Sequence, residues 1–342
     1  MTCLPSSKFD LRRHYNGASN GRPKGENTGE SMKKPDYIAA IVIGLAWMAC
    51  SAAALAQAVT AATPPPPSNP DWMTPVAPFR IADNLYYVGS KDLASYLIVT
   101  PKGNILINSS FVASVPLIRA SIEQLGFHFS DTKILLISHS HGDHDAGSAD
   151  VIKQTGAKYM VMDGDVPVVE SGGATDFAYG NQHYPAAKVS RVLHDGEEVR
   201  LGNAVLVAHK TPGHTRGCTT WTLQVKQSAG APGTGTPGAG TLNAVIVGSW
   251  NVNPGFRLVD KPGSPASYPH IADDYRHSFE VWKALPCDIF LGAHGMYFDM
   301  LAKLDRIKAG AKEDVWIDPV GYKNAVAERE AAFEKELKRQ QN

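Results

Sequence analysis

Hydrophobic residues from about position 79 onward occur in short runs separated by turn-forming residues. The runs "NLYYVG" (84–89), "SYLIVT" (95–100) and "NILINS" (104–109) are rich in β-branched and aromatic residues, with Gly, Lys-Asp and Pro-Lys-Gly between or beside them. Such short runs between turn signals are typical of neighbouring strands joined by tight connections. The pattern therefore predicts three antiparallel strands at the start of the folded part of the chain.

The following segments predict helices alternating with strands. In "SVPLIRASIEQLG" (114–126) apolar residues recur at helical spacing, and Gly126 is a suitable end for the helix. The continuous apolar run "KILLIS" (133–138) predicts a buried strand. A helix is expected within 146–156, and further strands within 158–162, 205–210, 218–225 and 243–249. Two batches of strands with helices between them indicate a layered α/β fold.

Two segments rich in proline or glycine and one amphipathic helix complete the pattern. "TPPPPSNPDW" (63–72) predicts a stiff linker, and "KQSAGAPGTGTPGAGT" (226–241) predicts a loop inserted between two strands. The C-terminal segment 322–341 predicts an ordinary surface helix with one apolar stripe. The stripe consists of Tyr322, Val326, Phe333 and Leu337.

The N-terminal region has the features of an export signal. Lys33 and Lys34 precede an uncharged run at 37–58 that ends in small residues, so we expect cleavage after Ala56 or Ala58. An uncleaved membrane anchor is the alternative, because about 20 apolar residues can span a bilayer. A lipid-modified Cys50 is disfavoured by the bulky Trp47 three residues before it.

These features divide the chain into four parts. We expect a disordered or over-extended prefix (1–31), a signal peptide (32–58), a proline-rich linker (59–78) and one α/β domain (79–342). The predicted location is the periplasm, with no stable membrane partner after the signal is removed.

Composition narrows the possible partners and the means of stabilisation. Of 342 residues 43% are hydrophobic, enough for a sizeable core, and the formal net charge of zero argues against nucleic acid as a partner. Cys218 and Cys287 are the two cysteines that follow the leader, too few for a disulfide-based scaffold. Both are expected to be buried free thiols.

A cluster of metal-binding side chains follows the buried strand predicted at 133–138. The segment "ISHSHGDHDAG" (137–147) contains the pattern H-x-H-x-D-H. Residues two apart at a strand end point the same way, so the first two histidines can hold one cation, while the loop turns the other residues toward a second. Imidazole and carboxylate ligands together favour zinc. The four residues are His139, His141, Asp143 and His144.

Two later histidines occur in the same kind of place. His214 lies in "TPGHT", between turn-forming residues and a β-type run, and His294 lies in "FLGAHG", at the end of an apolar run. The other histidines lack this context and are expected to be surface or packing residues. Among them, His183 in the loop "GNQHYP" is the one that could border a site.

Together these motifs resemble the metallo-β-lactamase superfamily, and more narrowly subclass 3 of the class B β-lactamases. The resemblance runs from about Asn84 to the C-terminal helix. It is carried by H-x-H-x-D-H, "GGATDFAYGN", "TPGHTRGCTTWT", "GSWNVNPGFRLV", "YPHIADDYRHSF" and "CDIFLGAHG". The resemblance implies an αββα sandwich of two βαβ-type halves, with the metal site in a cleft at one edge.

The resemblance also implies two zinc ions per chain. The ligands implied for the first zinc are His139, His141 and His214. The ligands implied for the second are Asp143, His144 and His294. Asp143 is further expected to orient the attacking water. The pKa of this water falls from its value in bulk toward about 7 when two zinc ions share it, so that hydroxide is the nucleophile at neutral pH.

One position separates the possible substrates. Thioesterases, lactonases and phosphodiesterases of the superfamily usually carry an aspartate that bridges the metals after a glycine, whereas this chain has Ser249 after Gly248. The resemblance therefore favours hydrolysis of the β-lactam ring of penicillins, cephalosporins and carbapenems. The alternatives are a lactone or thioester hydrolase of the same fold and an exported zinc-binding protein without catalysis. Open coordination positions on three-ligand metals favour an enzyme.

A serine mechanism is the competing way to open a lactam. Ser130 and Lys133 match S-x-x-K, but the companion motifs S-D-N and K-T-G are absent from the sequence. For substrate contacts, the resemblance points to Ser249, Asn253 and Tyr179, each of which could equally be a turn or packing residue.

Two positions depart from the family's pattern. Some relatives pair a cysteine at the Cys287 position with one near the last helix, where this chain has Tyr322, so Cys287 is expected to be unpaired. Asn108 stands where many members of the superfamily have aspartate, which weakens any expectation of a charged group supporting the metal ligands there.

Overall fold

The computed structural model describes residues 69–226, 240–311 and 314–342. Contacts divide the chain into two units, Met1–Pro65 and Pro66–Asn342, and every described residue belongs to the second. The predicted prefix, signal peptide and most of the glycine-rich insertion lie outside the described residues. Within the described part, no helix is both long and apolar enough to cross a membrane.

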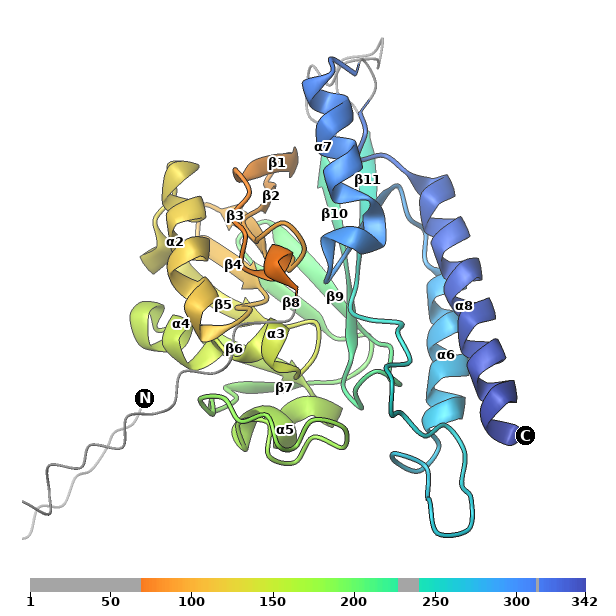
Figure 1. Cartoon of the computed structure of the whole chain (residues 1–342). Helices are drawn as coiled ribbons and strands as arrows, with labels where there is room; N and C mark the ends of the chain where they lie inside the picture. Colours follow the sequence, from red (N-terminus) through yellow and green to blue (C-terminus); the bar gives the residue numbers. More distant parts are fainter. Residues whose placement is uncertain (1–68, 227–239, 312–313) are drawn as a thin grey trace, which may run out of the picture. The chain divides into compact units, whose positions relative to one another are not determined.

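The first sheet has seven strands that follow one another in chain order (Figure 1). Its first four strands pair antiparallel and the rest pair parallel; the short apolar runs predicted β2, β3 and β4 but not β1. The strands are β1 (Phe79–Ala82), β2 (Leu85–Tyr87), β3 (Tyr96–Thr100), β4 (Gly103–Ile107), β5 (Thr132–Leu136), β6 (Lys158–Met162) and β7 (Arg191–Leu193).

The second sheet has five strands in the order β12-β11-β10-β9-β8. Its pairs are antiparallel except β11 with β12, which are parallel and connected through a helix. The strands are β8 (Glu198–Leu201), β9 (Ala204–Lys210), β10 (Thr219–Lys226), β11 (Thr241–Val247) and β12 (Ile289–Gly292).

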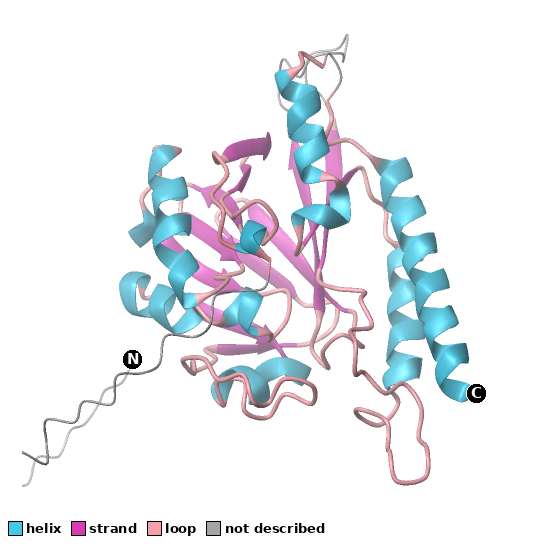
Figure 2. Ribbon diagram, viewed as in Figure 1, coloured by secondary structure: helices cyan, strands magenta, loops and turns pink. Residues whose placement is uncertain are grey.

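Helices cover the outer faces of both sheets (Figure 2). α2 and α4 lie on the first sheet, and α6 and α8 lie side by side on the second (Figure 1). The α-helices are α2 (Val115–Gln124), α3 (Gly142–Asp145), α4 (Ser148–Thr155), α5 (Val166–Glu170), α6 (Ile271–Ala284), α7 (Met300–Lys308) and α8 (Pro319–Gln341). Short 3-10 helices are η1 (Pro70–Trp72), η2 (Val112–Ser114), η3 (Phe129–Asp131), η4 (Asp163–Asp165) and η5 (Gly295–Phe298).

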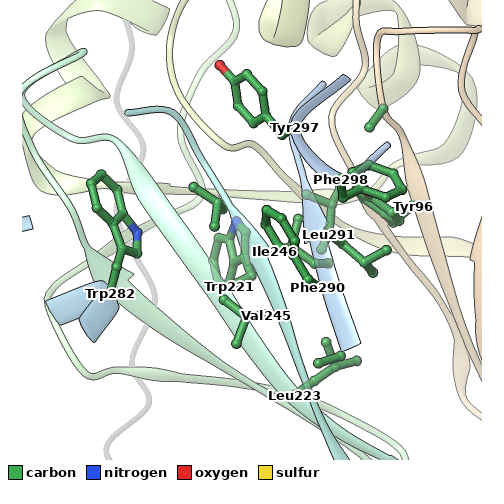
Figure 3. Packing of buried hydrophobic residues seen from close by; sticks show 14 of the residues in the cluster. Tyr96, Trp221, Leu223, Val245, Ile246, Trp282, Phe290, Leu291, Tyr297 and Phe298 are labelled. Atoms are coloured by element: carbon green, nitrogen blue, oxygen red, sulfur yellow. The ribbon is translucent and has the colours of Figure 1, made fainter. Parts of the chain in front are cut away.

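Alternation along the strands creates two apolar layers. In β3, Tyr96 and Ile98 belong to the large cluster that joins the two sheets and extends to α6 and α8, while Leu97 belongs to the cluster under α2 and α4. Successive strand side chains point to opposite faces, so one strand serves both layers. Figure 3 shows Trp221 and Ile246, cross-strand partners in the second sheet, within the central cluster. The layers run helix, sheet, sheet, helix, so the expected αββα sandwich is confirmed.

The stripe predicted for the C-terminal helix faces this sandwich. Tyr322, Val326, Phe333 and Leu337 are all buried along α8. Phe333 stacks on Tyr275 of α6 at 5.2 Å between ring centroids. The helix is thereby attached to the second sheet through α6.

Ordered structure begins earlier than the expected boundary at Phe79. Asn69 caps η1 by accepting a hydrogen bond from the amide of Asp71, and Pro75 forms a β-bridge with Ser90. The indole of Trp72 donates to Asp92 at 2.9 Å. The linker predicted for 59–78 was therefore too long at its C-terminal end, because proline content concealed a segment held by long-range contacts.

Candidate metal centre

The H-x-H-x-D-H segment forms a tight turn at the end of β5. His141 occupies the N-cap of the short helix α3 (Gly142–Asp145), and its carbonyl accepts hydrogen bonds from the amides of His144 and Asp145. Gly142 is the first residue of that helix. One helical turn thus returns Asp143 and His144 toward the strand end that carries His139.

The second sheet supplies the remaining two histidines. His214 lies in the loop between β9 and β10, which is closed by a hydrogen bond from the Thr211 amide to the Cys218 carbonyl. His294 directly follows β12, beyond Ala293. The ends of β5, β9 and β12 therefore bring histidines from both sheets to one edge of the sandwich.

All six predicted ligands meet at this edge. The ligand atoms of His139, His141 and His214 lie within 4.8 Å of one another, as do those of His139, Asp143 and His144. Around the predicted second metal position, Nε2 of His144 lies 3.2 Å from Nε2 of His294 and 3.2 Å from Oδ2 of Asp143. Nε2 of His294 lies 3.6 Å from the same carboxylate oxygen. These short distances support the predicted grouping of His294 with Asp143 and His144, while His139 borders both sets.

Unpartnered buried nitrogens show that the cluster suits a cation. Both ring nitrogens of His139, Nε2 of His141 and Nδ1 of His144 are buried without hydrogen bonds. Buried polar atoms normally have partners because desolvation otherwise costs free energy. Nε2 of His141 does lie 3.4 Å from a carboxylate oxygen of Asp176, but without hydrogen-bond geometry. Imidazole nitrogens with one carboxylate form a donor set that fits zinc.

The protonation states also suit metal binding. Burial, then the nearby His144, holds the pKa of His139 well below its usual value, and burial followed by His141 lowers the pKa of His214 to about 3. Burial alone would raise the pKa of the Asp143 carboxyl, but the adjacent His144 holds it far below its usual value. Neutral imidazole and ionised carboxylate are the forms that bind metals, so no proton needs to be displaced from these groups at neutral pH.

Two hydrogen bonds orient the histidines of the second sheet. Nδ1 of His214 donates to the Asn251 carbonyl at 2.8 Å, and Nδ1 of His294 lies 3.1 Å from Oδ2 of Asp92. A partner on one ring nitrogen fixes the tautomer and directs the other nitrogen toward the metal. Asp92 also accepts from the Met296 amide and from Trp72.

A buried carboxylate joins the two loops that carry the first set of ligands. Asp165 accepts hydrogen bonds from the Ser140 amide at 2.9 Å, the Thr215 hydroxyl at 2.8 Å and the Gly217 amide at 2.9 Å. Ser140 lies between His139 and His141, and Thr215 follows His214. Burial raises the pKa of Asp165, although its three donors oppose the rise.

The predicted substrate residues occupy different depths. The ring of Tyr179 lies edge-on to His141 at 4.8 Å between centroids, and its hydroxyl accepts a hydrogen bond from Asn253 at 2.9 Å. Ser249 is only 1% exposed, and its hydroxyl lies 3.0 Å from that of Tyr297. Tyr179 and Asn253 therefore line the site together, while Ser249 lies beneath it.

Asn108 has a supporting role that needs no charge. Its backbone is left-handed at φ 66°. The side-chain amide donates to the Ala94 carbonyl and the Ser138 hydroxyl, and its oxygen accepts from the Ser138 amide. Asn108 thus fixes the residue that precedes His139.

Sequence reasoning missed several groups that support the site. Asp176 lies within the quoted "GGATDFAYGN" and Asn251 within "GSWNVNPGFRLV", which gave a family signal but no role for either residue. The others had no recognisable local signal, since each acts through a contact distant in sequence. They are Trp72, Asp92, Asp165 and Tyr297.

The two cysteines of the described chain are free thiols, as expected. Cys218 is buried and Cys287 is half-buried, so the expectation of full burial holds for Cys218 alone. Tyr322, at the position where some relatives have the partner cysteine, instead donates its hydroxyl to the Trp282 carbonyl.

The fold and the histidine cluster agree with comparisons to known proteins. Residues 93–227 match the family model of the metallo-β-lactamase superfamily. The FEZ-1 metallo-β-lactamase of Legionella gormanii is 53% identical, with 79% of this chain and 98% of that chain covered and a TM-score of 0.72. The chain therefore belongs to the metallo-β-lactamase superfamily of enzymes.

Further solved structures define the subclass. BJP-1, a subclass B3 metallo-β-lactamase of Bradyrhizobium japonicum, is 33% identical, with 80% of this chain and 97% of that chain covered and a TM-score of 0.70. LRA-12, a class B3 di-zinc metallo-β-lactamase from an Alaskan soil metagenome, is 35% identical, with 79% and 98% covered and a TM-score of 0.69. Within the superfamily, the chain is of the B3 type, as the motifs predicted.

Proposed function

We propose that this protein hydrolyses the β-lactam ring of penicillins, cephalosporins and carbapenems with the help of two zinc ions. The observation that carries the proposal is the meeting of six ligand side chains at one edge of a sandwich shared with B3 metallo-β-lactamases. The description of LRA-12 as di-zinc supports the number of metal ions.

Each proposed zinc position combines ligands carried by both sheets. One zinc position is assigned to His139, His141 and His214. The other is assigned to Asp143, His144 and His294. When bound, zinc would supply a Lewis acid for the lactam carbonyl and for the departing nitrogen, and would lower the pKa of a water from its value in bulk toward about 7.

The chain's own residues position the reactants. The ionised Asp143 carboxylate has a second oxygen with which to accept a hydrogen bond from the attacking water and orient it. Tyr179 and Asn253, already hydrogen-bonded to each other beside His141, offer an aromatic edge and an amide to the substrate. Ser249 is buried and its hydroxyl is hydrogen-bonded to that of Tyr297, so it supports the site through Tyr297 rather than by direct contact with substrate. No serine nucleophile is needed, so no covalent acyl-enzyme forms.

The testing experiment is a steady-state assay across the three β-lactam classes, with a thioester and a lactone as comparison substrates. We expect β-lactam turnover that a chelator abolishes and added zinc restores, and that serine-directed inactivators leave unchanged. Metal analysis should give about two zinc ions per chain. Turnover of the thioester or the lactone with every β-lactam intact would refute the substrate assignment. Bound zinc without turnover of any of these substrates would indicate a zinc-binding protein without catalysis.

We further propose export to the periplasm. Support comes from Lys33 and Lys34 before the apolar run at 37–58 and from its small-residue end. Mass spectrometry of the exported protein should give an N-terminus near Gln57 or Val59. An intact N-terminus at Met32 would contradict cleavage.

A further inference from the structure

The last turn of α8 holds a loop that reaches the metal centre. Gln340, two residues before the end of the chain, donates from Nε2 to the Phe256 carbonyl at 2.8 Å. Its Oε1 accepts from the Leu258 amide at 2.7 Å. One side-chain amide therefore pairs with a donor and an acceptor of the loop backbone, as a neighbouring strand would.

The loop touches the predicted site directly. Phe256 is 3% exposed, and its ring centroid lies 5.8 Å from that of His214 and 6.3 Å from that of Tyr179. Its amide donates to the Asn253 carbonyl, and Asn253 in turn donates to the Tyr179 hydroxyl. A displacement of the backbone at Phe256 would therefore move both the aromatic wall and the amide assigned to substrate binding.

Packing between this loop and α8 is not continuous. A groove of about 900 Å³ lies between them, with residues of both elements on its walls, including Arg257 from the loop and Arg329 from α8. Where side chains do not fill the space between two elements, their separation depends on the specific bonds that cross it. The two hydrogen bonds of Gln340 cross at this groove.

The amide of Gln340 is itself fixed. Nε2 also donates to Oε1 of Glu336, one turn earlier, at 2.8 Å, and Glu336 accepts two hydrogen bonds from Arg339. With both oxygen and nitrogen partnered, the amide has one favoured orientation. The geometry suits a fixed attachment for the loop.

We propose that Gln340 is a positioning residue, which sets the height of the Asn253–Leu258 loop over the metal centre and thereby the affinity for substrate. The inference rests on the proposed function, because substrate affinity is one of its readouts. Gln340 touches no predicted metal ligand, so its loss should change substrate binding without removing zinc.

The test compares Gln340→Met with Gln341→Ala. Methionine keeps the length and helix propensity of glutamine and removes both loop hydrogen bonds, whereas Gln341 is an exposed neighbour in the same turn. We expect Gln340→Met to raise KM about five- to tenfold, with kcat within about twofold and zinc content unchanged. The peptide covering 253–259 should exchange its amide hydrogens faster in Gln340→Met. In Gln341→Ala both KM and the rate of amide exchange should be unchanged.

The outcomes separate this inference from the proposed function. Unchanged KM and unchanged exchange in Gln340→Met would overturn the positioning role, as would an equal effect of Gln341→Ala. If the unsubstituted protein turned over no β-lactam, the proposed function would fail, while the exchange measurement would still decide whether Gln340 fixes the loop. A loss of zinc from Gln340→Met would also contradict the inference, since it would place the effect on the ligands.

Discussion

Oδ2 of Asp92 lies 3.1 Å from Nδ1 of His294, although the two residues are 202 positions apart in the sequence. The contact leaves Nε2 of His294 facing His144 and Asp143. Asp92 receives two more hydrogen bonds, from the Trp72 indole and the Met296 amide. Its position is therefore fixed from three directions, and it fixes His294 in turn.

Replacing Asp92 should weaken the second metal position. In Asp92→Asn the negative charge beside His294 is removed, and one oxygen becomes an NH₂ group that must face at least one of the three donors, so the support for His294 is weakened. We expect zinc affinity at that position to fall by about 10- to 100-fold. Titration with a competing chelator measures this. Asp305→Asn, which alters an exposed ion pair with Lys308, is the control and should leave affinity unchanged; equal affinities for all three proteins would refute the role.

Asp143 and Ser249 should differ sharply in their effect on turnover. Asp143→Asn removes the charge beside His144 and His294, so we expect kcat to fall about a hundredfold or more. Ser249→Ala loses a single hydrogen bond to Tyr297 and should cost at most about tenfold. Steady-state kinetics at saturating zinc make the comparison. A larger loss for Ser249→Ala than for Asp143→Asn would contradict the assignment of roles.

Asp165 and Asp163 provide a matched pair for the stability of the ligand loops. Asp165→Asn places an NH₂ group among three donors in a buried site, which should lower the free energy of unfolding by about 1–3 kcal/mol. Asp163 forms an ion pair with Lys210 at 2.6 Å, and its side chain is 36% exposed. Asp163→Asn should therefore cost only about 0–1 kcal/mol. Urea unfolding of the zinc-loaded proteins distinguishes the two, and equal midpoints would be evidence against the bridging role of Asp165.

The two thiols should be unreactive in the folded protein. Burial, followed by the charge of Asp288, raises the pKa of Cys287 to about 12, and burial raises the pKa of Cys218 further. A raised pKa lowers the thiolate fraction at pH 8, and thiolate is the reactive form. Because an unfolded thiol ionises at lower pH, these groups should also make the fold less stable as pH rises above about 8.5.

A thiol reagent applied at pH 8 to the chain without its leader tests this. We expect slow labelling in buffer and rapid labelling of two thiols in denaturant. Rapid reaction of either cysteine under native conditions would show that its pKa is not raised.

Local sequence determined the elements with strong periodicity and the ligands that lie close together in the chain. "KILLIS" became β5, and the apolar stripe of 322–341 became the buried face of α8. His139, His141, Asp143 and His144 could be identified because one turn of α3 is enough to gather them. Weakly patterned elements were missed: in β7 both Arg191 and Val192 are exposed, so no alternation marks the strand.

Tertiary structure alone decided which distant residues complete and support the site. The motifs suggested His214 and His294, but only the packing of two sheets gives their distances from the first cluster. Asp92, Asp165, Gln340 and Trp72 act through hydrogen bonds to residues far away in the sequence. Such bonds leave no periodic or local signal, because a donor and its acceptor need to be neighbours only after the chain has folded.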